Sequence, residues 1–486
     1  MEPSLAYQQK LRRLGLLNKS LVAKVLTAID PTQPATEEDV GVYFLQPIHF
    51  GSSTEVSELN INRKGSPKIV PVIYKRYLPL SQRYFMNPSY DPSDDGKHTR
   101  EAANINAFHA HNPCQPQLYH FDSDRRLLVL EMKDGSYDTV LSEAFRAYQA
   151  TSSSRVKQEI RDQVRQDLDR ILSYTHHLMQ QFAENSSRGE HPLALTDPTL
   201  ESFRDQHLRN LGAVYDVCNQ VSLAKITKER DPLRRQRRLV SMLTTSRAME
   251  WTRKYDFQEE GDKLMDFLQL REAIAHTDLR PQNILFCDHD SKRHFSVCDL
   301  SGLRRGPSDL DLVSLLMDSR LTGMFSLEEL GAIHAFHYSR LQTMYGGQLT
   351  TKYTPKDRFS LAAVHILMRD IGAVITHLTQ TNPNESIDSP ESFEEWEIDK
   401  MVPLENISEY FARQYLSLFR VLRSTPLFPH LTSGISTFVP ERQRQILEER
   451  LHIDSPNRFW RGVSTLFRAG NRWFSSHNGH GLSIAL

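Results

Sequence analysis

The chain has 486 residues, 39% of them hydrophobic and 24% charged, a composition typical of a globular protein rather than a disordered one. Its 59 Lys and Arg nearly balance its 60 Asp and Glu, so no overall positive field attracts nucleic acid, and we expect no nucleic-acid partner. No stretch approaches the ~18 consecutive apolar residues of a membrane span. The four cysteines lack CxxC spacing, which argues against a disulfide framework or zinc ribbon and fits a reducing compartment. We therefore expect a soluble, cytoplasmic protein.

The first 132 residues are expected to hold a helix followed by a small sheet. Residues 5–29 mix apolar and basic positions, which predicts an amphipathic helix within an N-terminal extension over residues 1–35. Beyond it, β-branched and aromatic runs predict three strands, a helix and a fourth strand, at 43–50, 54–61, 69–77, 99–111 and 126–132. This order predicts an N-lobe over residues 36–132, with a small antiparallel sheet that carries one helix.

From about residue 150 the pattern is mainly helical. Apolar residues three and four apart predict helices at 154–183, 200–221, 234–256 and 261–274. The polar turn 288–293 lies between two short apolar runs and predicts a β-hairpin. We expect an α+β protein of two lobes, whose helical C-lobe spans residues 133–486, with an insertion at about 150–270 and a catalytic segment at 271–320.

The most informative stretch is HTDLRPQNILF, residues 276–286. Asp278 and Asn283 lie five residues apart in it, and Asp299 follows on the next predicted strand, sixteen residues after Asn283. Two carboxylates and an amide suit phosphoryl transfer, because this reaction needs positioning and charge neutralisation more than covalent chemistry. The stretch resembles the catalytic loop HxDLxxxN of the protein-kinase-like superfamily, and Asp299 resembles its metal-binding Asp. The branch it resembles is that of the aminoglycoside and choline phosphotransferases.

This resemblance implies a bilobal kinase-like fold and a kinase that uses ATP and Mg²⁺. It implies that Asp278 orients the acceptor hydroxyl and accepts its proton, and that Asn283 and Asp299 hold the metal. Arg280 stands where protein Ser/Thr kinases place a Lys, and it would neutralise the transferred charge as a bidentate donor. His276 is expected to support the backbone around Asp278.

A further motif, GPSDLDL at residues 306–312, resembles a segment of the aminoglycoside-type phosphotransferases. Asp311 falls twelve residues past Asp299, as the structural Asp of the family would, and Asp309 is the alternative. Such an Asp caps a helix and accepts hydrogen bonds from the catalytic-loop backbone.

In the N-lobe, Lys75 ends a β-branched and aromatic run and resembles the lysine that holds the α- and β-phosphates. Glu101, in the first turn of the next helix, would be its ion-pair partner. A solvent-facing strand lysine and an acid that favours a helix N-terminus are the alternative interpretations of the two residues. The run 127–132 resembles the strand that leads into the interlobe hinge, where backbone groups near Glu131 and Met132 would read the adenine edge.

Departures from the family pattern favour a small-molecule kinase over a protein kinase. There is no glycine-rich loop, and only Gly51 and Ser52, after the first strand, are placed to cover phosphates. Thr277 replaces the Arg of many protein kinases, and about 145 residues separate the hinge from His276. The acceptor would be a sugar, an aminoglycoside, an amino-alcohol or a lipid-linked sugar. A protein Ser/Thr kinase, which Arg280 favours, and a pseudokinase scaffold are the alternatives.

Three further runs carry weaker signals, each with a simpler alternative. The basic run 225–238 would bind a polyanion, or it is a solvated helix face. The acidic run 384–399 would attract a cationic substrate, or it is an exposed loop. The basic and aromatic run 458–474 would contact a membrane surface or a protein partner, or it packs on the helical lobe.

Overall fold

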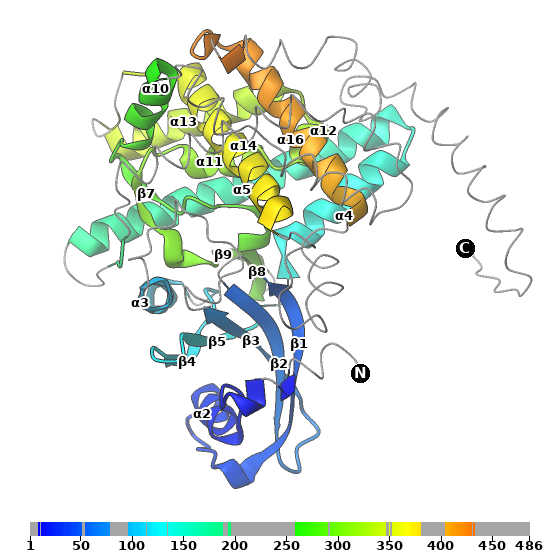
Figure 1. The fold of residues 1–486 in the computed structure, drawn as a ribbon, viewed down its shortest axis with the longest axis vertical. Coiled ribbons are helices and arrows are strands. Elements are labelled where there is room, and N and C mark those ends of the chain that lie inside the picture. Colours follow the sequence, from blue (N-terminus) through cyan, green and yellow to red (C-terminus); the bar gives the residue numbers. More distant parts are fainter. Residues whose placement is uncertain are drawn as a thin grey trace, which may run out of the picture.

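The computed structural model describes residues 8–9, 11–50, 54–77, 96–112, 114–133, 135–187, 193–195, 258–289, 292–346, 349, 352–380, 404–429 and 431–432. Within these ranges the chain forms two lobes, a small one built on an antiparallel sheet and a larger, mainly helical one (Figure 1). The predicted α+β, bilobal architecture is therefore confirmed. Gly51, Ser52 and the runs 225–238, 384–399 and 458–474 lie outside the described residues.

Within the described residues the N-lobe sheet has five strands in the order β1-β2-β3-β5-β4, and all neighbouring strands are antiparallel. The strands are β1 (Val40–Phe50), β2 (Thr54–Arg63), β3 (Val70–Tyr77), β4 (Leu118–Asp122) and β5 (Leu127–Glu131). Four of them match the predicted strands to within three residues at either end. The edge strand β4 was not predicted, because its sequence LYHFD is short and half-buried, without the alternation of a strand that buries one face.

The N-terminal helix is shorter than predicted. α2 spans Lys19–Ile29 and begins at Asn18, whose side chain accepts a hydrogen bond from the N–H of Leu21 at 2.8 Å. Just before this cap, Gly15 adopts a left-handed conformation with φ of 68°, which separates α2 from the helical residues that precede it. The apolar side of α2 packs on one face of the sheet, in a core that includes Leu26, Leu59 and Tyr74.

The opposite face of the sheet points toward the second lobe. Side chains alternate along a strand, so Lys75 and Tyr77 on β3 face away from α2, whereas Tyr74 faces it. Helix α3 (Lys97–His111), predicted at 99–111, connects β3 to β4 and contacts the 3₁₀ turn Leu300–Gly302 of the larger lobe.

The C-lobe consists mainly of helices. They are α4 (Tyr137–Ala150), α5 (Ser154–Ser187), α10 (Gln258–Leu268), α11 (Leu310–Leu316), α12 (Leu321–Met324), α13 (Leu327–Tyr345), α14 (Pro355–Gln380) and α16 (Leu404–Ser424). The predicted hairpin is present as β8 (Ile284–His289) and β9 (Lys292–Val297), with β6 (Gly135–Ser136) beside β8.

One predicted helix in this lobe is wrong at its C-terminal end. The pattern predicts a helix through residue 274, but α10 ends at Leu268, and Ala273–Ala275 form strand β7. This strand pairs with β10 (Arg304–Gly306) and leads directly into His276. Pairing with a partner thirty residues away overrides the local apolar pattern, which does not distinguish a short buried strand from a helix.

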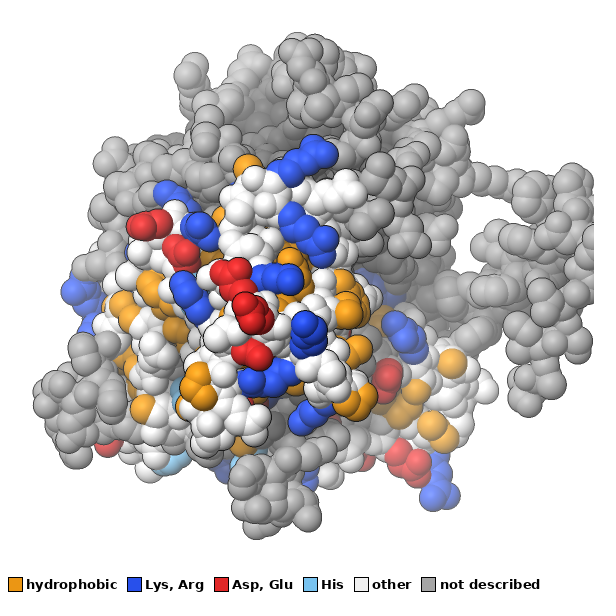
Figure 2. Space-filling view, turned by 90° about the horizontal axis from the view of Figure 1, so that it is seen from below, with side chains coloured by type: hydrophobic (Ala, Val, Ile, Leu, Met, Phe, Trp, Pro, Cys, Tyr) orange, Lys and Arg blue, Asp and Glu red, His pale blue; other side chains and the backbone are white. Residues whose placement is uncertain are grey.

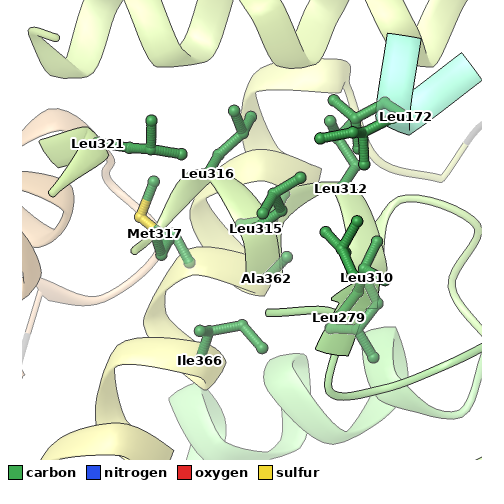
Figure 3. Close-up of a cluster of buried hydrophobic side chains, with 14 of the residues drawn as sticks. Leu172, Leu279, Leu310, Leu312, Leu315, Leu316, Met317, Leu321, Ala362 and Ile366 are labelled. Atoms are coloured by element: carbon green, nitrogen blue, oxygen red, sulfur yellow. The ribbon is translucent and has the colours of Figure 1, made fainter. Parts of the chain in front are cut away.

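The predicted catalytic segment rests on the core of the C-lobe. Leu279 is fully buried and lies beside Leu310 of α11, with Ile366 of α14 close by (Figure 3). The apolar side of α11 continues this cluster through Leu312, Leu315 and Leu316. The residue after Asp278 therefore anchors the loop in close-packed apolar surroundings, which limits how far the loop can shift.

The described surface of the N-lobe end mixes both charge signs with apolar side chains, as Figure 2 shows from below. Among the helices within the described ranges, none is both long and apolar enough to cross a membrane.

Cys114 is disulfide-bonded, which differs from the reduced cysteines that the sequence predicts, whereas Cys298 is a free thiol. Burial raises the pKa of the Cys298 thiol to about 12, so it stays protonated at ordinary pH.

Candidate active site

The lysine of β3 meets two carboxylates from distant parts of the chain. The Nζ of Lys75 lies 2.8 Å from the carboxylate of Glu101 on α3 and 3.0 Å from Oδ1 of Asp299, which follows β9. Burial would lower the pKa of Lys75, but the charges of Asp299 and Glu101 outweigh it and hold that pKa well above its usual value. The structure thus brings together three of the predicted residues, and Lys75 is a buried cation instead of a solvent-facing one.

Tyr77 completes this cluster and was not predicted from the sequence. It lies two residues after Lys75 on the same face of β3, and its hydroxyl donates a hydrogen bond to Oε2 of Glu101. Its ring also lies 5.2 Å from Nζ of Lys75, within the range of a cation–π contact. Both oxygens of the buried Glu101 carboxylate are therefore hydrogen-bonded, which compensates for its removal from water.

The catalytic loop folds back on itself around Asp278. The Nδ2 of Asn283 donates to the backbone oxygen of Asp278 at 2.9 Å, so the two residues of the motif lie against each other. The ring Nε2 of His276 lies 2.7 Å from the backbone oxygen of Cys298, the residue before Asp299. His276 therefore joins the catalytic loop to the segment that carries Asp299.

Asp311 holds the start of the same loop. Its two carboxylate oxygens accept hydrogen bonds from the backbone N–H groups of His276 at 2.6 Å and Thr277 at 2.7 Å. Asp309, the alternative residue, is instead fully buried against Arg358 and His334. Burial would raise the pKa of Asp309, but the His334 hydrogen bond and the Arg358 charge lower it to about 2. The contacts with the catalytic loop are thus those of Asp311.

Two residues of the site have unusual backbone conformations. Thr277 has φ of 69° and Asp299 has φ of 59°, a left-handed region that side chains other than glycine seldom adopt. The hydroxyl of Thr277 donates to the backbone oxygen of Gly302 at 3.2 Å. A Cβ at Gly302 would lie 3.2 Å from that hydroxyl, so glycine allows the two segments to approach closely. The surrounding hydrogen bonds offset the cost of these conformations.

Two arginines surround Asp278, and only one of them was predicted as a site residue. The Nε of Arg280 lies 2.7 Å and an Nη of Arg369 lies 2.9 Å from Oδ1 of Asp278. Burial would raise the pKa of Asp278, but the two guanidinium groups outweigh it and hold that pKa well below its usual range. Asp278 is therefore ionised at any ordinary pH.

The site offers oxygen donors that fit a magnesium ion. Among the described residues no three His, Cys, Asp or Glu side chains form a metal cluster by themselves. Mg²⁺ in phosphotransferases needs only one or two protein ligands, because substrate phosphates and water supply the rest. The carboxylate of Asp299, 40% exposed, and Oδ1 of Asn283, whose Nδ2 is engaged with Asp278, are the hard oxygen ligands that such an ion prefers. Lys75 lowers the pKa of Asp299 against the effect of burial and keeps it ionised.

The predicted adenine-binding residues lie at the end of β5. The backbone N–H of Glu131 donates to the oxygen of Gln117 at 2.8 Å, and the Glu131 side chain pairs with Lys133 at 2.8 Å. That N–H is therefore occupied by the link to the segment before β4. The backbone of Met132, the next residue, continues toward the C-lobe.

The sequence gives only weak signals for the site residues that were not predicted. Arg369 and Asp370 directly follow the buried run 361–368 of α14, which is apolar except for His365, and a charged pair in a buried helix indicates an ionic partner elsewhere. Tyr77 has the even spacing from Lys75 that puts two strand residues on one face. Neither pattern indicates which residue the side chain contacts, because that residue lies in another segment of the chain in each case.

No protein-family model matches the chain, and no curated protein matches it significantly in sequence. Several solved structures are similar to it in fold. A choline kinase from Cryptosporidium parvum Iowa II is 12% identical, with a TM-score of 0.42 over 85% of this chain and 99% of that one. Spectinomycin phosphotransferase APH(9)-Ia, in complex with ADP and spectinomycin, is 12% identical, with a TM-score of 0.33 over 77% and 94%. A microcompartment-associated aminopropanol kinase is 13% identical, with a TM-score of 0.35 over 84% and 99%. All three of those proteins are kinases or phosphotransferases named for small molecules.

Proposed function

We propose that the protein is an ATP- and Mg²⁺-dependent phosphotransferase that transfers the γ-phosphate to a hydroxyl group of a small molecule. The observation that carries this proposal is the contact of Lys75 with both Glu101 and Asp299. It joins the N-lobe sheet to the segment beside the catalytic loop. A buried cation next to a partly exposed carboxylate suits the phosphates and metal of a nucleotide.

The nucleotide half of the site is assigned to the N-lobe. Lys75 would pair with the α- and β-phosphates, and Glu101 would hold Lys75 in place. Backbone groups at Glu131 and Met132 would bind the adenine edge. Of these groups, the Glu131 N–H already donates a hydrogen bond to the backbone oxygen of Gln117. Gly51 and Ser52 remain predicted contacts of the phosphates. Asn283 and Asp299 would hold Mg²⁺, which neutralises phosphate charge when bound.

The transfer step is assigned to Asp278. The acceptor oxygen forms a bond to the γ-phosphorus, while the bond from that phosphorus to the bridging oxygen breaks and ADP leaves with its electron pair. Asp278 orients the hydroxyl and takes its proton as the new bond forms, then passes it to water. The low pKa of Asp278 makes orientation its larger contribution. Arg280, 2.7 Å from Asp278, is the residue that we assign to neutralising the transferred charge.

The acceptor is expected to be a sugar, an aminoglycoside or an amino-alcohol, with a lipid-linked sugar as the larger member of this class. The protein-kinase alternative predicts transfer to protein hydroxyls instead. A screen with γ-labelled ATP against small alcohols and a protein panel distinguishes the two, because the label appears in different fractions.

The first test is a thermal shift with ATP in the presence and absence of Mg²⁺. We expect a magnesium-dependent rise in the melting temperature of the wild type that is lost in Asp299→Ala. Asp266→Ala, which removes an exposed carboxylate of α10 paired with Lys352, is the matched control and should keep the rise. Failure of the wild type to respond to MgATP would contradict the proposal and favour the scaffold alternative.

A further inference from the structure

Helix α14 carries an ionic pair to the back of the catalytic loop. Ile366 of this helix packs in the core near Leu279 (Figure 3), and Asp370 lies one turn farther along the same side. Arg369 precedes Asp370, and the side chains of both are largely buried, at 19% and 6% exposure. A buried charge without a partner is strongly destabilising, so contacts of this pair are expected to matter.

Arg369 reaches two consecutive residues of the loop. One of its Nη atoms donates to the backbone oxygen of Thr277 at 2.7 Å, and the other donates to Oδ1 of Asp278 at 2.9 Å. Only a planar guanidinium provides two such donors in a fixed arrangement, which a lysine cannot reproduce. The same side chain therefore holds the strained backbone before Asp278 and the carboxylate of Asp278 itself.

Asp370 holds the arginines that contact Asp278. Its Oδ1 accepts from Arg280 at 2.5 Å and lies 3.5 Å from Nε of Arg369. Its Oδ2 accepts from Gln414 of α16 at 3.3 Å. The carboxylate thus links two helices of the C-lobe to both guanidinium groups at the catalytic loop.

The arrangement distinguishes the two oxygens of Asp278. Both guanidinium groups bind Oδ1, and no hydrogen bond to Oδ2 is present within the described ranges. The side chain of Asp278 is 41% exposed. Rotation of the carboxylate would break two charge-assisted hydrogen bonds. Oδ1 therefore stays bound to the two guanidinium groups, and Oδ2 is left to accept a hydrogen bond from another group.

We propose that Arg369, held by Asp370, is a positioning residue that fixes the rotamer of Asp278 and presents Oδ2 to the acceptor hydroxyl. This inference rests on the proposed phosphotransferase function. It assigns a role in that function to a residue about ninety positions along the chain from Asp278. This residue lies on a helix whose contact with the catalytic loop cannot be read from the motif.

The test compares Arg369→Ala and Arg369→Lys with wild type in MgATP turnover. Water serves as the acceptor at first, followed by any alcohol that the screen identifies. In Arg369→Ala we expect kcat to fall about 100-fold, as for a reacting group that loses its alignment, and KM for ATP to change by less than about threefold. Arg369→Lys keeps the charge but not the two bonds, so it should recover only part of kcat. Guanidinium ion added to Arg369→Ala should raise kcat, whereas urea, which has a similar shape and no charge, should not.

The control for helix damage is Lys356→Gln, which removes an exposed cation from the first turns of the same helix. It should leave kcat and the melting temperature unchanged. Wild-type kcat in Arg369→Ala, or equal rescue by urea and guanidinium, would overturn the proposal.

Hydrogen exchange of the backbone amides in residues 276–283 tests the positioning role of Arg369 without a measurement of turnover. Faster exchange in Arg369→Ala, with MgATP affinity unchanged, is expected if Arg369 holds the loop. Exchange equal to that of wild type would refute the positioning role. A wild type that binds no MgATP would instead refute the proposed function, and the exchange result would still stand by itself.

Discussion

Gln115 and Val297 are joined by a pair of hydrogen bonds that links the N-lobe to the strand before Asp299. The side-chain amide of Gln115 donates to the backbone oxygen of Val297 and accepts from its N–H at 3.3 Å. Farther along, Asn104 of α3 donates to the backbone oxygen of Leu300 at 2.9 Å. The helix that carries Glu101 and the segment just after it are therefore bound on either side of Asp299, and the two carboxylates that flank Lys75 are held as one unit.

Gln115→Met is expected to lower the free energy of unfolding by about 2–4 kcal/mol. The substitution leaves both backbone groups of Val297 buried without partners, at a cost of about 1–3 kcal/mol each. MgATP affinity should fall as well, because Asp299 lies two residues beyond Val297. Denaturant unfolding and a MgATP titration measure the two effects. Gln117→Met, an exposed position nearby, should change neither, and equal effects of both variants would contradict the role of the Gln115 pair.

Tyr77→Phe is expected to weaken MgATP binding about threefold to tenfold, corresponding to a lost hydrogen bond of about 1 kcal/mol to a carboxylate. Without the hydroxyl, one oxygen of Glu101 loses its donor and Lys75 is held less firmly. Tyr74→Phe is the matched control, because its hydroxyl donates to Leu16 on the opposite face of β3. That variant should lose stability and keep the affinity. Similar affinity losses in both variants would mean that the effect comes from the strand and not from Glu101.

Asp311→Asn is expected to reduce turnover by about 100-fold or more and to lower stability by about 2–3 kcal/mol. The asparagine has only one acceptor oxygen, and its NH₂ group would face one of the two backbone N–H groups of His276 and Thr277. Steady-state kinetics and thermal unfolding test the expectation. Asp266→Asn should have little effect, because it breaks only an exposed ion pair. Normal turnover in Asp311→Asn would show that the loop holds its conformation without this residue.

Acid is expected to destabilise the C-lobe through two buried histidines. Burial lowers the pKa of His176 on α5 to about 3 and that of His337 on α13 to about 4. In the unfolded chain both titrate near pH ~6.5, so below that value only the unfolded chain takes up their protons. The free energy of unfolding should therefore fall between pH ~6.5 and ~4, by up to about 1.4 kcal/mol per pH unit for each histidine.

His176→Leu isolates the contribution of one histidine to this pH dependence. The Nε2 of His176 is buried without a hydrogen-bond partner among the described residues, so leucine should be tolerated at pH 7. Denaturant unfolding at pH 7, 6 and 5 should show a shallower decline than in wild type. His177→Leu, at the exposed neighbouring position, should keep the wild-type slope. A slope that does not change in His176→Leu would assign the acid sensitivity to other groups.

The sequence determined the elements that depend on local pattern and on a fixed spacing. Four strands of the N-lobe, helix α3 and the β8–β9 hairpin follow from alternation and turn residues over short stretches. The catalytic motif was readable because Asp278 and Asn283 are five residues apart, so a single turn of chain brings them together. The spacing of Asp299 on the following strand also belongs to this local set.

The tertiary structure decided what depends on contacts between distant segments. Residues 273–275 became a strand because β10 was available to pair with them. Arg369 came to lie against Asp278 because α14 packs its apolar side on the core that also holds Leu279. Such contacts join residues from about thirty to about ninety positions apart, and no local periodicity specifies which partner a strand, a buried charge or an amide will meet. The sequence therefore determined the chemistry of the site, and three-dimensional packing determined the groups that hold it in position.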